Sequence, residues 1–551
     1  MDLEATIYIK TLDNWDPKDE SASGVGYQNW PYGSRFFAGK GGSTIRICGR
    51  KLQRTWTLLV QDASAGDTKI FLKDDPFTMG WQVGDKIGIA ATNRDGQTQG
   101  LGATSLGETH TITSFESVSL GMASVNSITL DSALVDGRWG GWRDFSGYSL
   151  ELAAEVVNLS RSVVFTGDYD DFDTKNNGFH TLSAKGGGRN IYDIRYTRFE
   201  NCGQQDLTAK YCTHFHFVDD CPNCVLQGNA YENAVQTAIT VHSVHNSLVD
   251  QNVMWNSRTV GIYIEDGNEM DNTISNNVAI CARTDRCSPR GDTGLPWQDN
   301  GFGGIYGYGM TNNFIGNRVA GHEAGMWFPG HLQPTGKGGA VGKVCPQFMP
   351  FGTFDGNVCH SCGQFGLYLE HQQSRNVQRD ENGYVVGHDT GSMASCEQFT
   401  ATGEDNGKIS VIVNHLDWHN VYTGGYEFTD IRFKDLTTVN QDCFQIKRLL
   451  EMFSMTESET GSYFENFGQR NHIHWRNAKD LVRTAAIGDD YYHIENGVFL
   501  QSRTGDDFGD CKLLLPGGNV NFEFSSDFTI IKGTVYAYSN SGLKPFLFLL
   551  V

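Results

Sequence analysis

The chain has 551 residues, of which 39% are hydrophobic and 12% aromatic, and its 65 glycines and 12 prolines are typical of a β-rich protein with many turns. Its formal net charge of −21 argues against a general affinity for nucleic acid or for an anionic membrane surface. No apolar run approaches the length of a membrane span, and the N-terminal residues "MDLEATIYIK" do not have the pattern of a signal peptide.

The middle of the chain, from about residue 189 to residue 375, repeats itself. In each repeat a short apolar strand ends at an asparagine, and a small or polar segment leads to a second strand. The aligned asparagines have spacings of 23, 25, 40 and 40 residues and are Asn229, Asn252, Asn277, Asn317 and Asn357. A period in the low twenties predicts a right-handed parallel β-helix in which these asparagines stack as a ladder. The two long spacings predict coils with insertions of roughly 16 residues, which form loops on one side.

The second strands predict two different faces, because alternate residues of a strand point to opposite sides. The inward face is apolar and contains Ile239, Val241, Ile262, Ile264, Ile305, Met326, Phe328, Leu367 and Leu369. The outward face is mostly aromatic and contains Tyr263, Tyr306, Tyr308, Trp327 and Tyr368. We interpret the outward column as an exposed platform on which sugar rings stack. The alternative is that aromatic residues simply favour β-strands.

Histidines and carboxylates extend the same outward face. In "THFHF" (213–217), alternation places His214 and His216 on one face and Phe215 and Phe217 on the other. His242 follows His216 by 26 residues, which is about one coil.

Glu265 follows His242 by a further 23 residues, so it is expected one rung beyond. Asp220 and Asp266 end the strands of this face nearby.

This set of residues is compatible with several chemistries. Three neutral imidazoles, His214, His216 and His242, can bind one divalent metal, either calcium or a transition metal. Without a metal, His242 and the carboxylates Asp220, Glu265 and Asp266 can act as general acid and base on a glycosidic bond.

A polysaccharide lyase would instead need a base, for which His242, Tyr263 or Tyr308 is available. The residues alone do not choose between hydrolase and lyase.

The two insertions contain basic residues. Residues 281–301 include Arg283 and Arg286, and residues 331–347 include Lys337. We expect them to form a locally basic rim that holds an anionic polysaccharide on an otherwise acidic protein. The alternative is that they are solvated loop tips.

The 13 cysteines include two closely spaced pairs, "CPNC" (221–224) and "CHSC" (359–362). A zinc site would require the two pairs to meet in space. Disulfides formed in an oxidising compartment are the simpler interpretation, and they predict an extracellular or cell-surface protein. The single N-glycosylation sequon, at Asn158, does not indicate heavy glycosylation.

Long segments resemble a known family. They are "GQQDLTAKYCTHFHFVDD" (203–220), "AITVHSVHNSLVDQNVMWNSRTVGIYIEDGNEMDNTISNN" (238–277) and "NNFIGNRVAGHEAGMWFPGH" (312–331). They look like the β-helix of the cell-migration-inducing hyaluronidase (CEMIP), transmembrane protein 2 and fibrocystin. Residues 41–59 and 81–93 resemble the domain named for eight conserved glycines, which precedes the β-helix in this family. The likeness covers roughly residues 30–375.

The resemblance implies an all-β chain with four parts. They are an N-terminal segment (1–30), an eight-glycine-type domain (31–148), the β-helix (149–475) and C-terminal coils or a cap (476–551).

The resemblance also implies an extracellular hyaluronidase in which Asp220, His242, Glu265 and Asp266 match active-site motifs. The segment between the two histidine motifs is shorter here than in the family. The alternative is a fibrocystin-like surface protein that binds glycan without cleaving it.

Overall fold

The computed structural model is an all-β structure with one short helix among the residues that it describes. These are 4–10, 35–92, 106–120, 123–145, 148–168, 177–184, 189–205, 207, 209–283, 287, 303–331, 334–336, 344–346, 349–363, 365–372, 410–420, 423–429, 431–435, 437–439, 444–446, 492–495, 498–500 and 529–532. The chain forms two compact units. The first contains residues 1–263, 272–306 and 317–323, and the second contains residues 264–271, 307–316 and 324–551.

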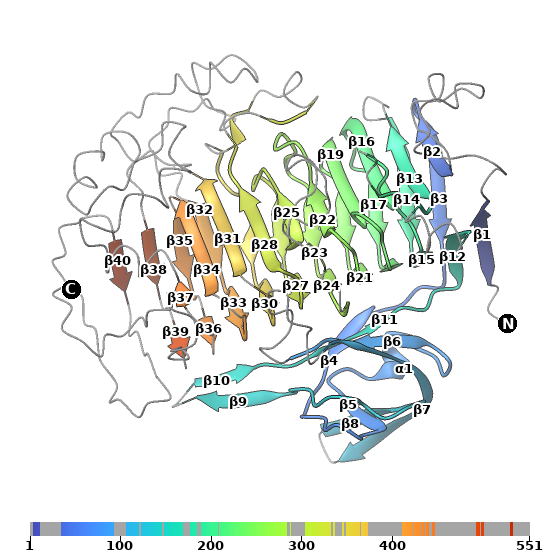
Figure 1. Ribbon diagram of the computed structural model, residues 1–551, viewed down its shortest axis with the longest axis vertical. Helices are drawn as coiled ribbons and strands as arrows, with labels where there is room; N and C mark the ends of the chain where they lie inside the picture. Colours follow the sequence, from blue (N-terminus) through green and yellow to red (C-terminus); the bar gives the residue numbers. More distant parts are fainter. Residues whose placement is uncertain are drawn as a thin grey trace. The chain divides into compact units, whose positions relative to one another are not determined.

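The first unit contains coils of a parallel β-helix, whose three strands per coil contribute to three sheets (Figure 1). The first sheet contains β1 (Ala5–Ile9), β12 (Val163–Gly167), β15 (Thr197–Glu200), β18 (Ala230–Glu232), β21 (Val253–Trp255), β24 (Val278–Ile280) and β27 (Arg318–Ala320). The second contains β2 (Phe36–Lys40), β13 (His180–Ala184), β16 (Thr213–Asp220), β19 (Ile239–His245), β22 (Val260–Ile264) and β25 (Gly303–Gly307). The third contains β3 (Thr44–Cys48), β14 (Ile191–Arg195), β17 (Cys224–Gln227), β20 (Leu248–Asp250) and β23 (Thr273–Ser275).

The second unit has the same three-sheet plan. Its strands in the first sheet are β30 (Val358–His360), β33 (Leu416–Trp418), β36 (Thr437–Val439) and β39 (Val498–Leu500). Those in the second are β28 (Ala324–Pro329), β31 (Phe365–Gln372), β34 (Thr423–Thr429) and β37 (Phe444–Ile446). Those in the third are β26 (Asn313–Ile315), β29 (Phe354–Asp355), β32 (Ser410–Val413), β35 (Ile431–Lys434), β38 (Tyr492–Glu495) and β40 (Thr529–Lys532). The C-terminal residues therefore include further coils.

The predicted asparagine ladder is present in the first unit. Asn252 accepts a hydrogen bond from the backbone N–H of Asn229 and donates its side-chain amide to the Leu226 carbonyl at 2.8 Å. Its own backbone N–H bonds to Oδ1 of Asn277, which is linked to Asn317 in the same way. Each asparagine thus satisfies backbone groups at a buried turn, where an unmade bond would be costly.

Stacked rings reinforce the interior of the same coils. Phe165 stacks on Phe199 with ring centroids 5.0 Å apart, and Phe199 stacks on Tyr231 at 4.9 Å. The inward residues predicted for the second strands are all buried, as expected of a core.

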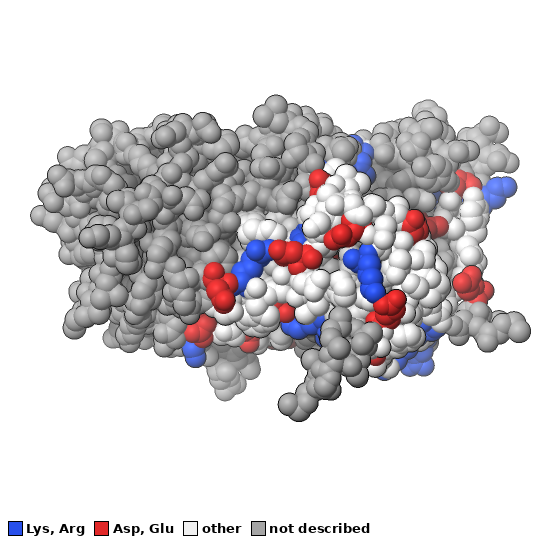
Figure 2. All heavy atoms as spheres, turned by 90° about the horizontal axis from the view of Figure 1, so that it is seen from below, with Lys and Arg blue, Asp and Glu red and all other residues white. Residues whose placement is uncertain are grey.

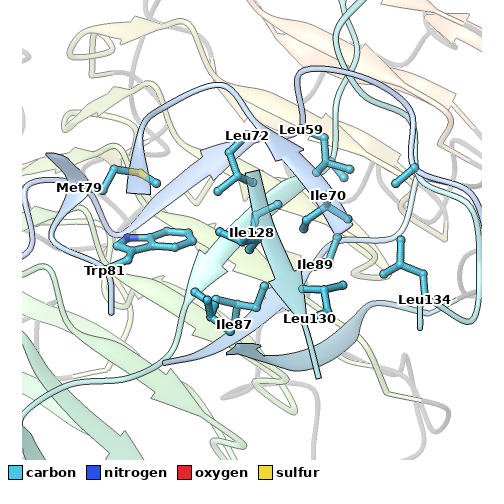
Figure 3. Close-up of a cluster of buried hydrophobic side chains, with 14 of the residues drawn as sticks. Leu59, Ile70, Leu72, Met79, Trp81, Ile87, Ile89, Ile128, Leu130 and Leu134 are labelled. Atoms are coloured by element: carbon cyan, nitrogen blue, oxygen red, sulfur yellow. The ribbon is translucent and has the colours of Figure 1, made fainter. Parts of the chain in front are cut away.

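An antiparallel domain follows the first coil of the β-helix. Its main sheet has the order β4 (Trp56–Leu58), β11 (Glu155–Asn158), β6 (Lys86–Ile89), β7 (Glu108–Leu120), β8 (Ala123–Leu130) and β5 (Lys69–Leu72). A two-stranded ribbon of β9 (Trp142–Phe145) and β10 (Tyr148–Glu151) and a short helix, α1 (Pro76–Met79), complete it. Buried side chains that include Leu59, Ile70, Trp81, Ile128 and Leu130 fill its interior (Figure 3).

The expected start of this domain was wrong. β2 and β3 lie within the range 31–148, but they pair in parallel with β13 and β14 and so belong to the β-helix. The alternation of residues in β2 and β3 is compatible with a parallel or an antiparallel sheet, so the sequence pattern alone did not assign these strands to the β-helix.

The domain packs against the β-helix coils of the same unit. Trp255 is buried among apolar residues of both parts, and a methyl group at Gly88 would lie 2.4 Å from its ring. Around this contact, Lys86 pairs with Glu232 and the buried Glu155 pairs with Arg318. The face in Figure 2 shows acidic and basic side chains interspersed, so its described surface has no single-sign patch.

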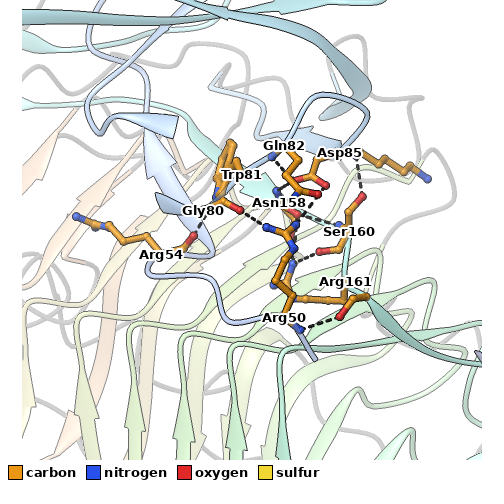
Figure 4. Close-up of polar contacts among 11 residues, drawn as sticks. Arg50, Arg54, Gly80, Trp81, Gln82, Asp85, Asn158, Ser160 and Arg161 are labelled. Carbon is orange, nitrogen blue, oxygen red and sulfur yellow. Dashed lines mark hydrogen bonds and ion pairs between the residues drawn. The ribbon is translucent and has the colours of Figure 1, made fainter. Parts of the chain in front are cut away.

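A buried polar network stabilises the segment between β11 and β12, where the chain passes from the antiparallel domain back into the β-helix (Figure 4). The Arg161 guanidinium donates to the carbonyls of Gly228 and Asn158, and burial lowers its pKa to about 9. Asn158 donates its side-chain amide to Asp85 at 2.7 Å and is fully buried. The only sequon is therefore inaccessible to glycosylation in the folded chain.

Acid sensitivity is expected from His322, which is fully buried and lacks a hydrogen-bond partner for either ring nitrogen among the described residues. Burial lowers its pKa from 6.5 to about 3. As the pH falls below 6.5, the unfolded chain binds a proton that the folded chain cannot. Stability should therefore fall by up to about 1.4 kcal/mol per pH unit between pH 6.5 and 3.

Urea unfolding at pH 6.5 and pH 4.5 checks this expectation. His322→Phe should remove about 2–3 kcal/mol of the loss between these pH values. An unchanged pH dependence in the variant would show that His322 is not the cause.

Candidate functional site

Three histidines converge on the second sheet of the first unit. His216 in β16 and His242 in β19 are paired in register, and their Nδ1 atoms lie 3.2 Å apart. Nε2 of His214 lies 3.3 Å from Nδ1 of His242. His214 and His216 lie on the rung next to that of His242, as predicted, and one nitrogen of each of the three rings lies within 4.8 Å of the other two.

The orientation of His214 is set by the backbone. Its Nδ1 lies 3.3 Å from the Ala209 carbonyl, which can only accept, so Nδ1 carries the proton and Nε2 has a lone pair. His214 is fully buried, and burial lowers its pKa well below the usual range, with the charges of His216 and His242 acting in the same direction. A neutral imidazole fixed through its other nitrogen is the usual form of a histidine metal ligand.

The spacing of the nitrogens fits a tetrahedral metal. Bonds of about 2.1 Å at tetrahedral angles place two ligand atoms roughly 3.4 Å apart. The two measured separations, 3.2 and 3.3 Å, are close to this value. His214, His216 and His242 therefore fit a transition metal with a fourth position open, and they fit calcium poorly because calcium prefers oxygen ligands.

The predicted alternation fails at Phe217. Its φ is 53°, and the pairing of β16 with β19 shifts between His216 and Asp219. The Phe217 ring consequently packs against His242, with centroids 4.2 Å apart, instead of pointing away from the histidines. Phe215 remains in the core as expected.

Asp220 lies beyond this irregularity and is exposed. It is paired in register with His245, and its carboxylate accepts a hydrogen bond from the Asn246 amide at 2.7 Å. Asp219 beside it is also exposed. The strand that carries the histidines thus ends in two solvated carboxylates.

The aromatic column is more deeply buried than predicted. Tyr263 and Tyr306 in the first unit are 3% and 6% exposed, and their rings lie 5.5 Å apart. Tyr211 also packs edge-on against Tyr263. The expected open stacking platform is therefore wrong for these rings, because they pack on one another.

In the second unit, Tyr368 is also buried, and it stacks on Trp327 at 5.0 Å. Trp327 and Tyr308 are half-buried, and Tyr308 packs edge-on against His331.

The other predicted carboxylates belong to the second unit. Asp266 is buried in a turn, where its backbone N–H donates to Glu269 and its carboxylate accepts from the Thr335 hydroxyl at 3.3 Å. Glu265 is half-buried.

The predicted basic rim is only partly described. Arg283 is half-buried, whereas Arg286 and Lys337 lie outside the described residues.

Lys210 was missed by the sequence reasoning. It is 7% exposed, it follows the residue whose carbonyl orients His214, and burial lowers its pKa to about 8. Burial of a loop lysine has no sequence signal, so only the structure reveals it.

Three disulfides join cysteines of the described residues. Cys202–Cys212, Cys221–Cys224 and Cys281–Cys287 are disulfides, which excludes a zinc site that uses both closely spaced pairs. Several disulfides are typical of secreted domains. No helix among the described residues has the length and apolar character of a membrane span.

Comparison with known proteins identifies the β-helix. Residues 176–367 match the family model of the CEMIP beta-helix. This region is therefore similar to the β-helix of that family. The family resemblance and the fold class inferred from the sequence are thereby confirmed.

Known relatives are distant and much longer. A G8 domain-containing protein of Dictyostelium discoideum is 27% identical over 61% of this chain and 21% of its own length. Human fibrocystin-L is 25% identical over 61% of this chain and 8% of its own length. The chain thus spans about a fifth of the first relative.

Among solved structures, the catalytic unit of an α-1,3-glucanase from Streptomyces thermodiastaticus is 9% identical. The comparison covers 90% of this chain and 100% of that one, with a TM-score of 0.29. A likeness of this degree carries no functional argument.

Metal binding is the first property to test at the three histidines. His242→Ala should weaken Zn²⁺ binding at this site by more than about 100-fold, since loss of an outer-shell partner alone costs 10–100-fold. Isothermal titration calorimetry measures it, and His245→Ala on the same strand is the matched control. Equal affinities of the two variants would contradict the assignment.

Proposed function

We propose that this chain is part of an extracellular enzyme that cleaves an acidic polysaccharide, hyaluronan-like, beside the three histidines. The observation that carries the proposal is the convergence of three imidazole nitrogens at metal-ligand spacing next to exposed carboxylates. The similarity to the CEMIP beta-helix supports the same class of function.

Each residue near the cluster has a role in this proposal. A divalent transition metal held by His214, His216 and His242 would supply a Lewis acid. Asp220 would donate or accept the proton at the glycosidic oxygen, because it is one of the two solvated carboxylates on the histidine strand and the one that matches the aspartate of the resembling family. Lys210, which follows the residue whose carbonyl orients His214, would hold an anionic group of the substrate. The binding roles of Arg283, Arg286 and Lys337 stay predictions from the sequence.

The remaining candidate residues have a smaller part. Glu265 is half-buried and belongs to the second unit, so its role as a second carboxylate stays a prediction from the sequence. Asp266 is engaged in its turn, so we assign it to positioning of that turn. Within the second unit, the half-buried Trp327 and Tyr308 are better candidates for contact with a sugar than the buried Tyr368. Tyr263 and Tyr306 of the first unit are buried.

A second function is a glycan-binding surface protein without hydrolase or lyase activity. The observation that favours it is the burial of the aromatic rings, which removes the open platform expected of a processive polysaccharide site. In that case the histidine cluster would stabilise the coil, and the chain would act as a rigid binding element.

The two functions are separated by product formation. The purified chain is incubated with size-defined hyaluronan and other uronate-containing polysaccharides, with and without a chelator, and chain length is followed on gels. We expect shortening that the chelator abolishes and that Zn²⁺ or another transition metal restores.

The variants test the proposed roles. His242→Ala should reduce kcat/KM by more than about 100-fold, and Asp220→Asn by about 10²- to 10⁴-fold through loss of proton transfer. His245→Ala is the control. Retained binding with no shortening of any substrate would overturn the enzyme proposal in favour of the binding function.

A further inference from the structure

A second set of metal-binding side chains lies within the second unit. Cys359 is in β30, Asp417 is its register partner in β33, and His415 immediately precedes β33. One ligand atom from each of the three lies within 4.8 Å of the other two. All three residues are at most 1% exposed.

His415 stands where the coils otherwise place an asparagine. Val358 pairs with Leu416, so His415 occupies on its rung the position that Asn357 occupies on the previous one. The Asn357 side chain donates to the Phe314 carbonyl at 2.8 Å, as ladder asparagines do. At the next rung the ladder amide is thus replaced by an imidazole, and a cysteine and an aspartate adjoin it.

The hydrogen bonding of this cluster is incomplete. Nε2 of His415 lies 3.1 Å from Oδ2 of Asp417. Within the described part of the chain, Nδ1 of His415 and Oδ1 of Asp417 are buried and have no hydrogen-bond partner. Buried polar atoms are normally satisfied, and a cation bound by the carboxylate would satisfy Oδ1 of Asp417.

Glycines leave room for the same side chains. A methyl group at Gly366 would lie 2.0 Å from Oδ1 of Asp417, and one at Gly325 would lie 2.7 Å from Sγ of Cys359. Any larger residue at either position would displace a member of the cluster. The neighbouring strands β28 and β31 are thus shaped to admit the thiol and the carboxylate.

We propose that Cys359, His415 and Asp417 bind one Zn²⁺ ion, or a chemically similar transition metal, inside the β-helix. Sulfur, imidazole nitrogen and carboxylate oxygen together are a ligand set of zinc, and the burial of all three residues favours a role in stability. The ion would join β30 to β33 at the rung where the asparagine ladder is interrupted. This site is independent of the three-histidine site and of the proposed enzyme activity.

Cys362 is not assigned as a ligand. It lies three residues after Cys359, but its thiol lies 3.4 Å from the His360 carbonyl, as a donor would. It is also a buried thiol in the same short segment, which makes Cys362→Ser a matched control for Cys359→Ser.

Cobalt substitution tests the proposal with a signal that the three-histidine site cannot give. The full chain is purified without reducing its disulfides, stripped of metal and titrated with Co²⁺. A thiolate-to-cobalt charge-transfer band should appear at one equivalent and be displaced by Zn²⁺. Ligation by imidazoles alone gives no such band.

The variants identify the ligands. The band should be lost in Cys359→Ser and retained in Cys362→Ser. His415→Asn, which restores the ladder residue type and so should fold, should weaken Co²⁺ binding at least tenfold. Circular dichroism and the thermal midpoint establish that each variant is folded.

Three results would overturn the proposal. They are the absence of a thiolate band in the wild-type chain, a band lost in Cys362→Ser but not in Cys359→Ser, and a Cys359–Cys362 disulfide found by mass spectrometry of the purified chain. Since polysaccharide cleavage is not the readout, failure here leaves the proposed function untouched, and the reverse also holds.

Discussion

The structure of the first unit depends on one recurring interaction, the hydrogen bonds of buried asparagines to the backbone at the turn between two sheets. Each coil must bend its chain at a place that water cannot reach, and there backbone groups need partners. An asparagine offers both a donor and an acceptor, so it can bond to a carbonyl of the preceding coil and to the N–H of its neighbour in the ladder. Repetition of this residue fixes the register of every adjacent strand.

Register is what brings the histidines together. His216 and His242 are 26 residues apart in sequence, and they meet because β16 and β19 are paired in parallel as neighbouring strands of the second sheet. The site lies at an irregularity in β16, where Phe217 has a positive φ. Because of this conformation, the Phe217 ring packs against His242, and Asp219 and Asp220 at the end of the strand are exposed to solvent. The regular pairing of the strands sets the spacing of the histidines, and the irregularity at Phe217 exposes the carboxylates at the end of β16.

Sequence reasoning succeeded where a property repeats and failed where it depends on a single backbone conformation. The asparagine spacing and the alternation of Ile262 and Ile264 predicted the coils and their core, because a period of one coil constrains both. The direction of Phe217 depends on one left-handed residue, and the burial of Tyr263 depends on rings from other coils. Neither has a signature in the local sequence. The pairing of Cys221 with Cys224 also required coordinates, since spacing alone allows zinc as well as a disulfide.

The antiparallel domain has a consequence for how the chain folds. β1, β2 and β3 form the first coil, yet their partners β12, β13 and β14 come only after the whole domain, with Ala5 paired to Val163. During synthesis, the strands of the first coil therefore remain unpaired until more than a hundred further residues have left the ribosome. All strands of the antiparallel domain lie within that interval, and β-helix growth is expected to start from later coils, whose strands are close in sequence, and to reach the N-terminal coil last.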